Sequence, residues 1–422
     1  MDGSNSEGGR NTPSSPSSQA STAVASENGI TVVAIAAHGD IVLRIEHQIG
    51  KGKAVRSFRV DSRTLRSNSK YFESLLQPGR FGEAANIEAR HKSICERYGN
   101  LAQAPAEELP IVDIEDLGRI NVKTIDGLVS DFLYVLHGND THSHPPVANL
   151  ANLAVVADRF DALKMVKDYV RRKKMIRALD GKTTPKQDAV LTEEKVRQRL
   201  LVGIMLDYPA WVDRYSARMI TKGWVGAELE ISTPLWWDLA SRVEDELSFR
   251  RDSVLDTIQS LQAHFLRLYT SRDRQCKLGY DSSTQCDSFQ LGEMVRFFTR
   301  IGTLQFQGTV FDVNDPPTPY AGDVFTLLDT LRQVPEYQID KFHTHCGIRT
   351  RMLPLLDLIQ AWLQCVGICL DCWQEHRADY AWIDAKPPLL WKRQNGRPRA
   401  EGHGNRHAGV RGLFTATEKD WT

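Results

Sequence analysis

Four residues near the end of the chain have the types and spacing of a metal site. His343 and Cys346 form one pair, and Cys369 and Cys372 form a second pair with the same spacing. Pairs of imidazole and thiolate ligands at this spacing let two turns of backbone place four donors tetrahedrally around Zn²⁺. The sequence therefore predicts a structural zinc ion bound by His343, Cys346, Cys369 and Cys372.

The segment between the two pairs opposes this arrangement. Apolar residues from Met352 to Val366 recur at helical spacing, so they predict an amphipathic helix between the pairs. A helix of about 14 residues spans about 21 Å, and its two ends cannot share an ion unless the chain turns back. Cys276 and Cys286 are alternative ligands, either with Cys346 or with the Cys369 and Cys372 pair. A further alternative is that all these cysteines are small buried thiols beside helix ends.

The other sequence patterns with chemically active residues do not predict an enzyme. His137, His142 and His144 lie in one polar loop, and this pattern favours a solvated loop over a metal site. The glycines at Gly50 and Gly52 lack the spacing of a phosphate-binding loop and predict a hairpin turn. Nucleophile-elbow, zinc-protease, kinase and dinucleotide-binding motifs are absent from the sequence. We therefore expect a protein that is not an enzyme.

Composition narrows the class of protein further. The chain has 422 residues, 53 Lys and Arg, 53 Asp and Glu, and seven cysteines. This length suits two or three domains. Zero net charge argues against nucleic acid or an anionic membrane as the main partner. Few cysteines, odd in number, favour thiols in a reducing intracellular compartment, cytoplasmic or nuclear.

Neither the start of the chain nor its most apolar stretch predicts a membrane segment. Residues 1–28 are rich in Ser, Gly and Pro and predict a disordered tail, without a signal peptide or anchor. The stretch from Pro354 to Trp373 is interrupted by Asp357 and Asp371, so it predicts a core helix and no membrane span.

The first third of the chain alternates between strand and helix patterns. The β-branched run from Ile30 to Ile45 contains Gly39-Asp40 and predicts a strand, a tight turn and a second strand. Later segments predict a third strand, one helix ending before Pro78, a fourth strand and three helices: Val55–Val60, Leu65–Leu76, Ile111–Ile114, Ile125–Leu136, Val147–Asp158 and Asp161–Arg177.

In this region the chain resembles the BTB (POZ) family. The motifs are Gly39-Asp-Ile-Val-Leu43, Phe58-Arg-Val60, Ser67 to Phe72, Phe81-x-Glu83, Ile111-Val-Asp-Ile114, Tyr134 to Gly138 and Ala154 to Phe160. Together, in this order, they cover residues 38 to about 175. Asp61-Ser62 replaces the frequent His-Lys and is similar to fungal members. The resemblance implies an α+β BTB/POZ domain over 29–180, a small mixed sheet flanked by helices, with an insertion at 84–109 that we expect to be a surface loop or short helix.

The resemblance also implies a function. BTB domains are protein-interaction modules that form dimers or dock cullin-type ubiquitin ligases and transcriptional partners. Phe81 and Glu83 match the family's hydrophobic-x-Glu docking motif in type and position. The alternative is that Phe81 fills the domain core and Glu83 caps the following turn.

The remainder predicts a mostly α-helical C-terminal region. A Gly- and Pro-containing linker is expected between Ala178 and Leu191, a helical domain over 190–384 with its tryptophans in the core, and a basic disordered tail over 385–422. The expected function is non-enzymatic protein–protein interaction, with a homodimer or a protein partner. The alternatives are a cullin-ligase substrate adaptor and a zinc-containing transcriptional regulator that uses the basic tail.

Overall fold

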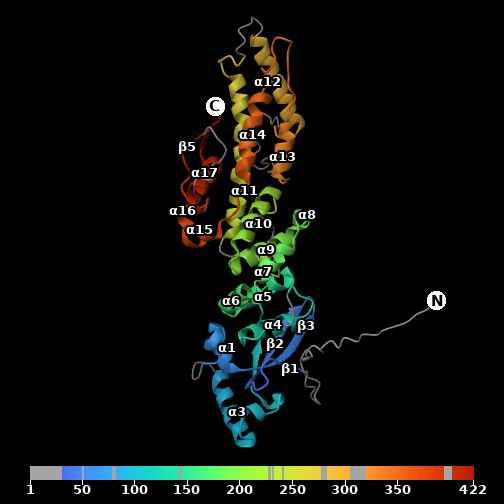
Figure 1. Cartoon of the computed structure of the whole chain (residues 1–422), viewed down its shortest axis with the longest axis vertical. Coiled ribbons are helices and arrows are strands. Elements are labelled where there is room, and N and C mark those ends of the chain that lie inside the picture. The colour runs from blue at the N-terminus through green and yellow to red at the C-terminus, as the bar shows by residue number, and fades with distance from the viewer. Residues whose placement is uncertain are drawn as a thin grey trace, which may run out of the picture. The chain divides into compact units, whose positions relative to one another are not determined.

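The fold is taken from a computed structural model that describes residues 31–49, 52–77, 82–141, 145–226, 230, 232–239, 242–276, 283–304, 320–393 and 402–422. The expected disordered tail over 1–28 lies outside these residues. The chain divides into two compact units. The first contains most residues up to His142, and the second contains nearly all residues from Ser143 onward, together with Gly118–Val122. Figure 1 labels the elements of both.

A small mixed sheet forms the centre of the first unit. Its strands are β1 (Val32–Ala34), β2 (Ile41–Ile49), β3 (Gly52–Val60) and β4 (Ile111–Ile114), in the order β1-β3-β2-β4. The predicted hairpin is confirmed, because β2 and β3 pair antiparallel from Ile41 opposite Val60 to Ile49 opposite Gly52. The first predicted strand does not pair with the second. It lies parallel to β3, and β4 lies parallel to β2.

The predicted helix over Leu65–Leu76 is two helices, α1 (Ser62–Asn68) and α2 (Lys70–Leu75). Ser69 between them has extended backbone, and its hydroxyl accepts a hydrogen bond from the Phe72 amide and donates one to the Phe160 carbonyl. A serine that caps the following helix satisfies an amide that would otherwise have no partner. The ring of Phe72 stacks on Phe160, which in turn stacks on Phe132 of α4 (Asp126–Leu136).

The insertion at 84–109 contains a longer helix than the expected surface loop or short helix. It forms α3 (Gly82–Tyr98), a 17-residue helix, followed by two short 3₁₀ turns. Ile94 of α3 and Leu109 pack with Val32 and Val42 of the sheet in one apolar cluster. Apolar positions spaced through a polar, alanine-rich segment were enough to give this helix a buried face.

The second unit begins with helices that the sequence analysis placed in the BTB-like domain or in a linker. They are α5 (Val147–Arg159), α6 (Leu163–Arg172), α7 (Met175–Lys182) and α8 (Pro185–Ala189). The linker prediction over Ala178–Leu191 is wrong because α7 continues to Lys182 and a capping box formed by Thr184 and Gln187 starts α8. Helix α5 belongs to the second compact unit, whereas the BTB-like domain was predicted to extend to residue 180.

Long helices build the rest of the second unit. They are α9 (Glu193–Met205), α10 (Pro209–Lys222), α11 (Val243–Thr270), α12 (Ser283–Arg300), α13 (Val324–Arg332) and α14 (Arg349–Leu363). The predicted core role of the tryptophans is confirmed for Trp211 and Trp236, whose side chains are fully buried. Buried Arg250 of α11 binds Glu246 and donates to the carbonyls of Val366 and Gly367, so α11 fixes the chain just after α14.

The last part of the chain corrects the prediction of a disordered basic tail. After α15 (Leu370–Glu375) and α16 (Arg377–Tyr380), strand β5 (Leu390–Lys392) pairs parallel with β6 (Glu418–Asp420), and α17 (His403–Thr415) lies between them in the sequence. Val410, Leu413 and Phe414 are buried at helical spacing. The many Arg and Gly residues outweighed this apolar face in the sequence pattern. None of the helices in the described segments is long and apolar enough to cross a lipid bilayer.

Candidate metal centres

The four residues predicted to share one zinc ion belong to two separate clusters. His343 and Cys346 lie before α14, whereas Cys369 and Cys372 lie after it. The helix has 15 residues, and each pair finds its partners elsewhere in the fold. The prediction of a single site is therefore wrong. A helix of this length holds its two ends too far apart for them to share an ion.

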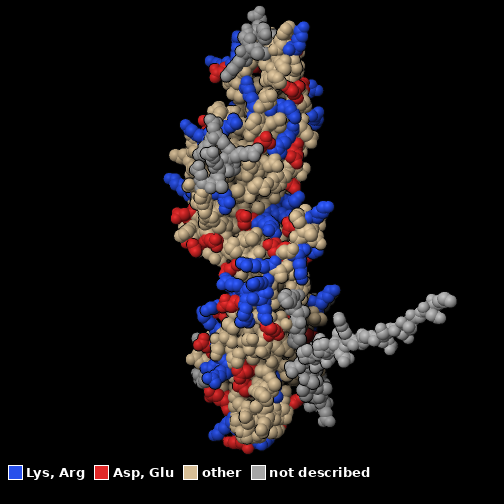
Figure 2. Space-filling model, viewed as in Figure 1, with Lys and Arg blue, Asp and Glu red and all other residues tan. Residues whose placement is uncertain are grey.

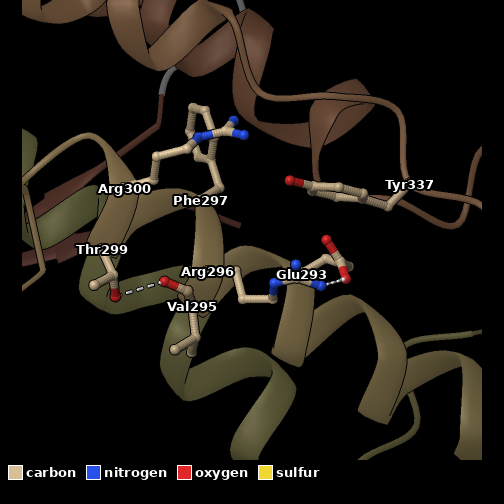
Figure 3. A pocket seen from close by; sticks show the side chains of 7 residues that line it. All are labelled: Glu293, Val295, Arg296, Phe297, Thr299, Arg300 and Tyr337. Atoms are coloured by element: carbon tan, nitrogen blue, oxygen red, sulfur yellow. Dashed lines mark hydrogen bonds and ion pairs between the residues drawn. The ribbon is translucent and has the colours of Figure 1, made fainter.

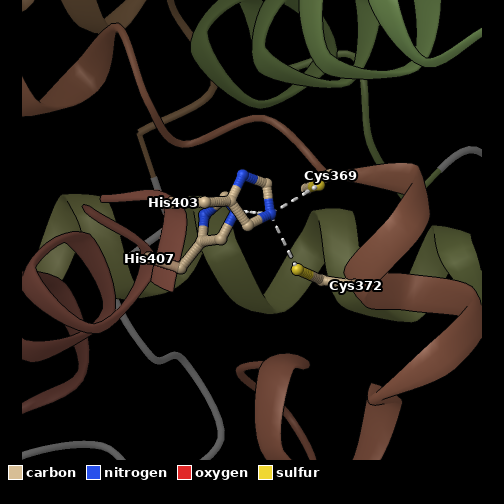
Figure 4. A group of neighbouring side chains, drawn as sticks. All are labelled: Cys369, Cys372, His403 and His407. Carbon is tan, nitrogen blue, oxygen red and sulfur yellow. Dashed lines mark hydrogen bonds between the residues drawn. The ribbon is translucent and has the colours of Figure 1, made fainter. Parts of the chain in front are cut away.

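The C-terminal cluster consists of Cys369, Cys372, His403 and His407, whose ligand atoms all lie within 4.8 Å of one another. The Nε2 atom of His403 is 3.5 Å from Cys369 Sγ, 3.1 Å from Cys372 Sγ and 3.2 Å from His407 Nε2. Figure 4 shows both thiols and both imidazoles pointing toward one centre. Zn–S bonds of about 2.3 Å and Zn–N bonds of about 2.0 Å in a tetrahedron require ligand atoms about 3.3 to 3.8 Å apart. The observed separations are close to this range.

Two elements position these four side chains. His403 and His407 are four residues apart on α17, so they share one helix face. Cys369 immediately precedes α15 and Cys372 lies in its first turn. The Cys369 amide donates to the Tyr380 hydroxyl at 2.7 Å, and the Tyr380 ring meets the His407 ring edge to face. The cluster therefore joins α15 to α17 at a partly exposed position.

The surroundings of the C-terminal cluster shift the pKa values of two of its side chains. Burial, then nearby His403, lowers the pKa of His407 to about 4, so its imidazole is neutral at physiological pH and can bind a metal. Burial, then the neighbouring Cys369, raises the pKa of the Cys372 thiol to about 11. A metal ion reverses that preference because it binds the thiolate.

The buried cluster consists of Cys276, Cys286 and His343, with Cys346 beside them. Ligand atoms of the first three lie within 4.8 Å of one another, and all three residues are buried. The Sγ atoms of Cys276 and Cys346 are 3.7 Å apart. This is the grouping of Cys276 and Cys286 with Cys346 that the sequence analysis left as an alternative. All seven cysteines of the chain lie in described segments and are thiols.

Hydrogen bonds hold the buried cluster from three sides. Asp340 Oδ1 lies 2.8 Å from His343 Nδ1, and the hydrogen bond from His343 lowers the pKa of the Asp340 carboxyl. Asp287 accepts from the Cys276 amide at 2.9 Å, and the Tyr269 hydroxyl donates to the Cys346 carbonyl at 3.1 Å. Burial, then its neighbours Cys346 and Cys276, raises the pKa of the Cys286 thiol.

His403 and His407 were not predicted as ligands from the sequence. Their signal was present, since Cys369-x-x-Cys372 followed by His403-x-x-x-His407 has the paired spacing of a Cys₂His₂ zinc site. The 30 residues between the two pairs exceed the usual finger loop, and the second pair fell in the segment predicted to be disordered.

The other candidate residues are described only in part. Glu83 lies exposed in the first turn of α3, and Phe81 lies outside the described residues. His137 is not solvated: its Nε2 lies 3.1 Å from the Asp61 amide and its Nδ1 lies 2.7 Å from the Leu133 carbonyl, so it ties α4 to the start of α1. His142 and His144 also lie outside the described residues.

A surface hollow of about 470 Å³ lies beside α12. Figure 3 shows Arg300 and Tyr337 on its opposite sides. The guanidinium of Arg300 lies over the Phe297 ring at 5.7 Å, and Arg296 pairs with Glu293 at 2.9 Å. Of the lining residues, Arg296 and Glu293 form an ion pair with each other, and Arg300 contacts an aromatic ring.

Both signs of charge are interspersed on the face drawn in Figure 2, in keeping with the zero net charge. Within the described residues, the longest run of consecutive exposed basic residues is Arg171–Lys174, which comprises the last two residues of α6 and the two residues before α7.

Comparison with protein-family models, curated proteins and solved structures gives no match. The described fold defines a protein with a small mixed α/β unit and a helical unit that carries two Cys/His clusters. The resemblance to the BTB family rests on the sequence motifs quoted above.

Proposed function

We propose that this chain is a non-enzymatic intracellular protein-interaction protein whose helical unit contains structural zinc. The observation that carries the zinc assignment is the convergence of Cys369, Cys372, His403 and His407 at ligand–ligand distances that suit a tetrahedral ion. Four protein ligands close the coordination sphere and leave no position for a water or substrate, which is typical of structural zinc. Thiolate and imidazole ligands also favour Zn²⁺ over Mg²⁺ or Ca²⁺.

The role of this ion follows from the elements that it joins. Helix α17 packs on α11, and the Thr257 hydroxyl of α11 donates to the Phe414 carbonyl. The ion would bind the exposed start of α17 to α15. Zinc binding free energy becomes folding free energy where the site does not exist in the unfolded chain. The ion would therefore stabilise the C-terminal part of the helical unit.

The interaction role is proposed for the first unit. It is supported by the ordered set of BTB-like motifs and by the small mixed sheet with flanking helices, which is the type of fold that the resemblance implies. The proposed partners are a second copy of the chain or another protein. The test is the mass of the full-length protein in solution over a range of concentrations, combined with affinity purification. A strict monomer that retains no protein would contradict the proposal.

A cullin-type adaptor is the second candidate. The observation that favours it is the exposure of Glu83 at the start of α3, in the motif that the family uses for docking. We expect a Phe81→Ala, Glu83→Ala double variant to lose co-purification with a cullin scaffold. The matched control is Glu88→Ala on the same exposed helix. Equal recovery of the cullin with all three proteins would exclude this role.

The zinc assignment is tested by the metal content of full-length protein purified without added chelator. We expect Cys372→Ser and His403→Ala each to lose one equivalent of zinc relative to wild type. Cys365→Ser is the matched control because this cysteine lies in the same unit and outside both clusters. Equal zinc content in wild type and in both ligand variants would overturn the assignment.

A further inference from the structure

We propose that the buried cluster binds a second zinc ion through Cys276, Cys286, His343 and Cys346, and that Asp340 orients His343 for this role. This site goes beyond the proposed function because none of its residues belongs to the C-terminal cluster. The four residues come from three segments: the chain before α12, the first turns of α12, and the loop before α14.

The spacing of the ligand atoms supports a metal. The Sγ atoms of Cys276 and Cys346 are 3.7 Å apart, and tetrahedral Zn–S bonds of about 2.3 Å place two sulfurs about 3.8 Å apart. Ligand atoms of Cys276, Cys286 and His343 also lie within 4.8 Å of one another. His343-x-x-Cys346 supplies two ligands from one turn, as paired zinc ligands commonly do.

Asp340 gives His343 the environment of a metal-binding histidine. Its carboxylate accepts from the His343 Nδ1–H at 2.8 Å and from the Phe342 amide at 2.8 Å. With Nδ1 bound to a carboxylate, Nε2 is the nitrogen that binds the metal. This carboxylate–histidine pair fixes the tautomer and increases the basicity of the ligand.

Two other states of the cluster are less compatible with these observations. A disulfide between Cys276 and Cys346 needs an S–S distance of about 2.05 Å and would leave a third thiol and an imidazole beside it. Three thiols that pack only as small apolar groups would not require a buried imidazole beside them. The His343 imidazole is 1% exposed and is held by a carboxylate, which that alternative leaves unexplained. A closed Cys₃His set accounts for all four side chains together.

A zinc ion here would hold together a region with little other regular structure. Cys276 follows the end of α11, and His343 and Cys346 lie in a loop of turns between α13 and α14. Two side chains already fix the ligand-bearing backbone: the Asp287 carboxylate accepts from the Cys276 amide, and the Tyr269 hydroxyl donates to the Cys346 carbonyl. The ion would therefore complete a nearly preformed site.

The test is cysteine labelling of the full-length wild-type protein by an alkylating reagent, read by peptide mass spectrometry before and after removal of metal with a chelator, and again after zinc is restored. We expect Cys276, Cys286 and Cys346 to be protected with zinc, labelled without it and protected again on restoration. Exposed Cys95 should be labelled throughout. Labelling of the three cysteines that does not respond to zinc would overturn the proposal.

Variants separate the two sites. A Cys372→Ser, His403→Ala double variant should retain one zinc equivalent, bound at the buried cluster, and the Co²⁺ form of that variant should show thiolate-to-cobalt absorption. Zinc content of zero in that variant, with its helical circular dichroism intact, would exclude the second site and leave the C-terminal site standing. Asp340→Asn should weaken zinc binding about 10- to 100-fold while all four ligands remain. Asp329→Asn, an exposed aspartate of the same unit, is its control.

Discussion

Cys372 Sγ and His403 Nε2 lie 3.1 Å apart although the two residues are 31 positions apart in the sequence. This proximity closes a loop that contains α16 and β5 and brings the start of α17 onto α15. The segment predicted to be a solvated basic arm therefore contributes two of the four residues of the C-terminal cluster and several buried apolar side chains.

Loss of zinc should act locally on α17. We expect His407→Ala to increase hydrogen exchange in His403–Thr415 and to leave exchange in α12 unchanged, because α12 lies at the other cluster. His407→Cys should restore protection, since a thiolate can replace imidazole as a zinc ligand. Peptide-resolved hydrogen exchange of the full-length protein measures both effects. Uniform exchange changes across α12 and α17 would contradict a local role.

The aromatic core under α17 should contribute strongly to stability. Phe414 is 1% exposed, and its ring stacks on Trp382 with centroids 5.8 Å apart. Phe414→Ala should lower the free energy of unfolding by about 3 to 5 kcal/mol, because it removes buried area and leaves a cavity. Leu389→Ala is the control: this side chain is 79% exposed and should change stability by less than about 0.5 kcal/mol. Urea denaturation followed by tryptophan fluorescence measures the difference.

Two glycines of the first unit should respond oppositely to alanine. A Cβ at Gly39 would lie 2.5 Å from the Val60 carbonyl oxygen, so Gly39→Ala should force the β2–β3 hairpin apart and destabilise it by about 1 to 3 kcal/mol. A Cβ at Gly127, near the start of α4, meets no atom within 4 Å. Gly127→Ala should be neutral or stabilise by up to about 1 kcal/mol. Hydrogen exchange in Ile41–Ile49 distinguishes the variants, and equal protection in both would refute the steric argument.

The first unit should lose stability as pH falls because of His137. Burial lowers the pKa of His137, so the unfolded chain takes up a proton at a higher pH than the folded one. The stability due to neutral His137 is fully present above the unfolded pKa of about 6.5 and is lost as pH falls below it. Protonation also converts Nε2, the acceptor for the Asp61 amide, into a donor.

The pH effect is measured as exchange of the Asp61 region at pH 7.5 and 5.5, after correction for intrinsic exchange rates. We expect His137→Leu to reduce the difference between the two conditions. His345→Gln, an exposed substitution in the other unit, should keep the wild-type difference. A wild-type difference that persists in His137→Leu would assign the pH response to another group.

Local sequence patterns predicted those helices and strands whose apolar residues recur at the spacing of the face that is buried in the fold. The β2–β3 hairpin, β4, α4 and α5 follow from alternation, apolar period and turn residues. The spacing of apolar residues did not reveal the break at Ser69, because it continues at helical period through both halves of the predicted helix. Helix α3 was expected to be no more than a surface loop or short helix, because its mean composition is polar and only a few positions, such as Ile94, are buried.

The sequence predicted which Cys and His residues could be ligands, but it did not predict which of them lie together. Spacing along the chain brings together His343 with Cys346 and Cys369 with Cys372, and each pair lies in its own cluster. The remaining ligands come from Cys276 and Cys286 in one case and from α17 in the other, and these approaches depend on how helices pack. Only the length of α14 indicated in advance that the two pairs could not share one ion.

The late position of α17 and β6 along the chain has a consequence for folding during synthesis. Strand β6 and helix α17 come after every other element of the helical unit, so the ribosome makes α11 and α14 well before the residues that cover them. Until α17 is made, the face of α11 that receives Phe414 stays open to water, and Cys369 and Cys372 lack their histidines. The nascent chain therefore passes through a stage with an uncovered apolar surface and a half-built thiol pair, a stage at which chaperones commonly bind.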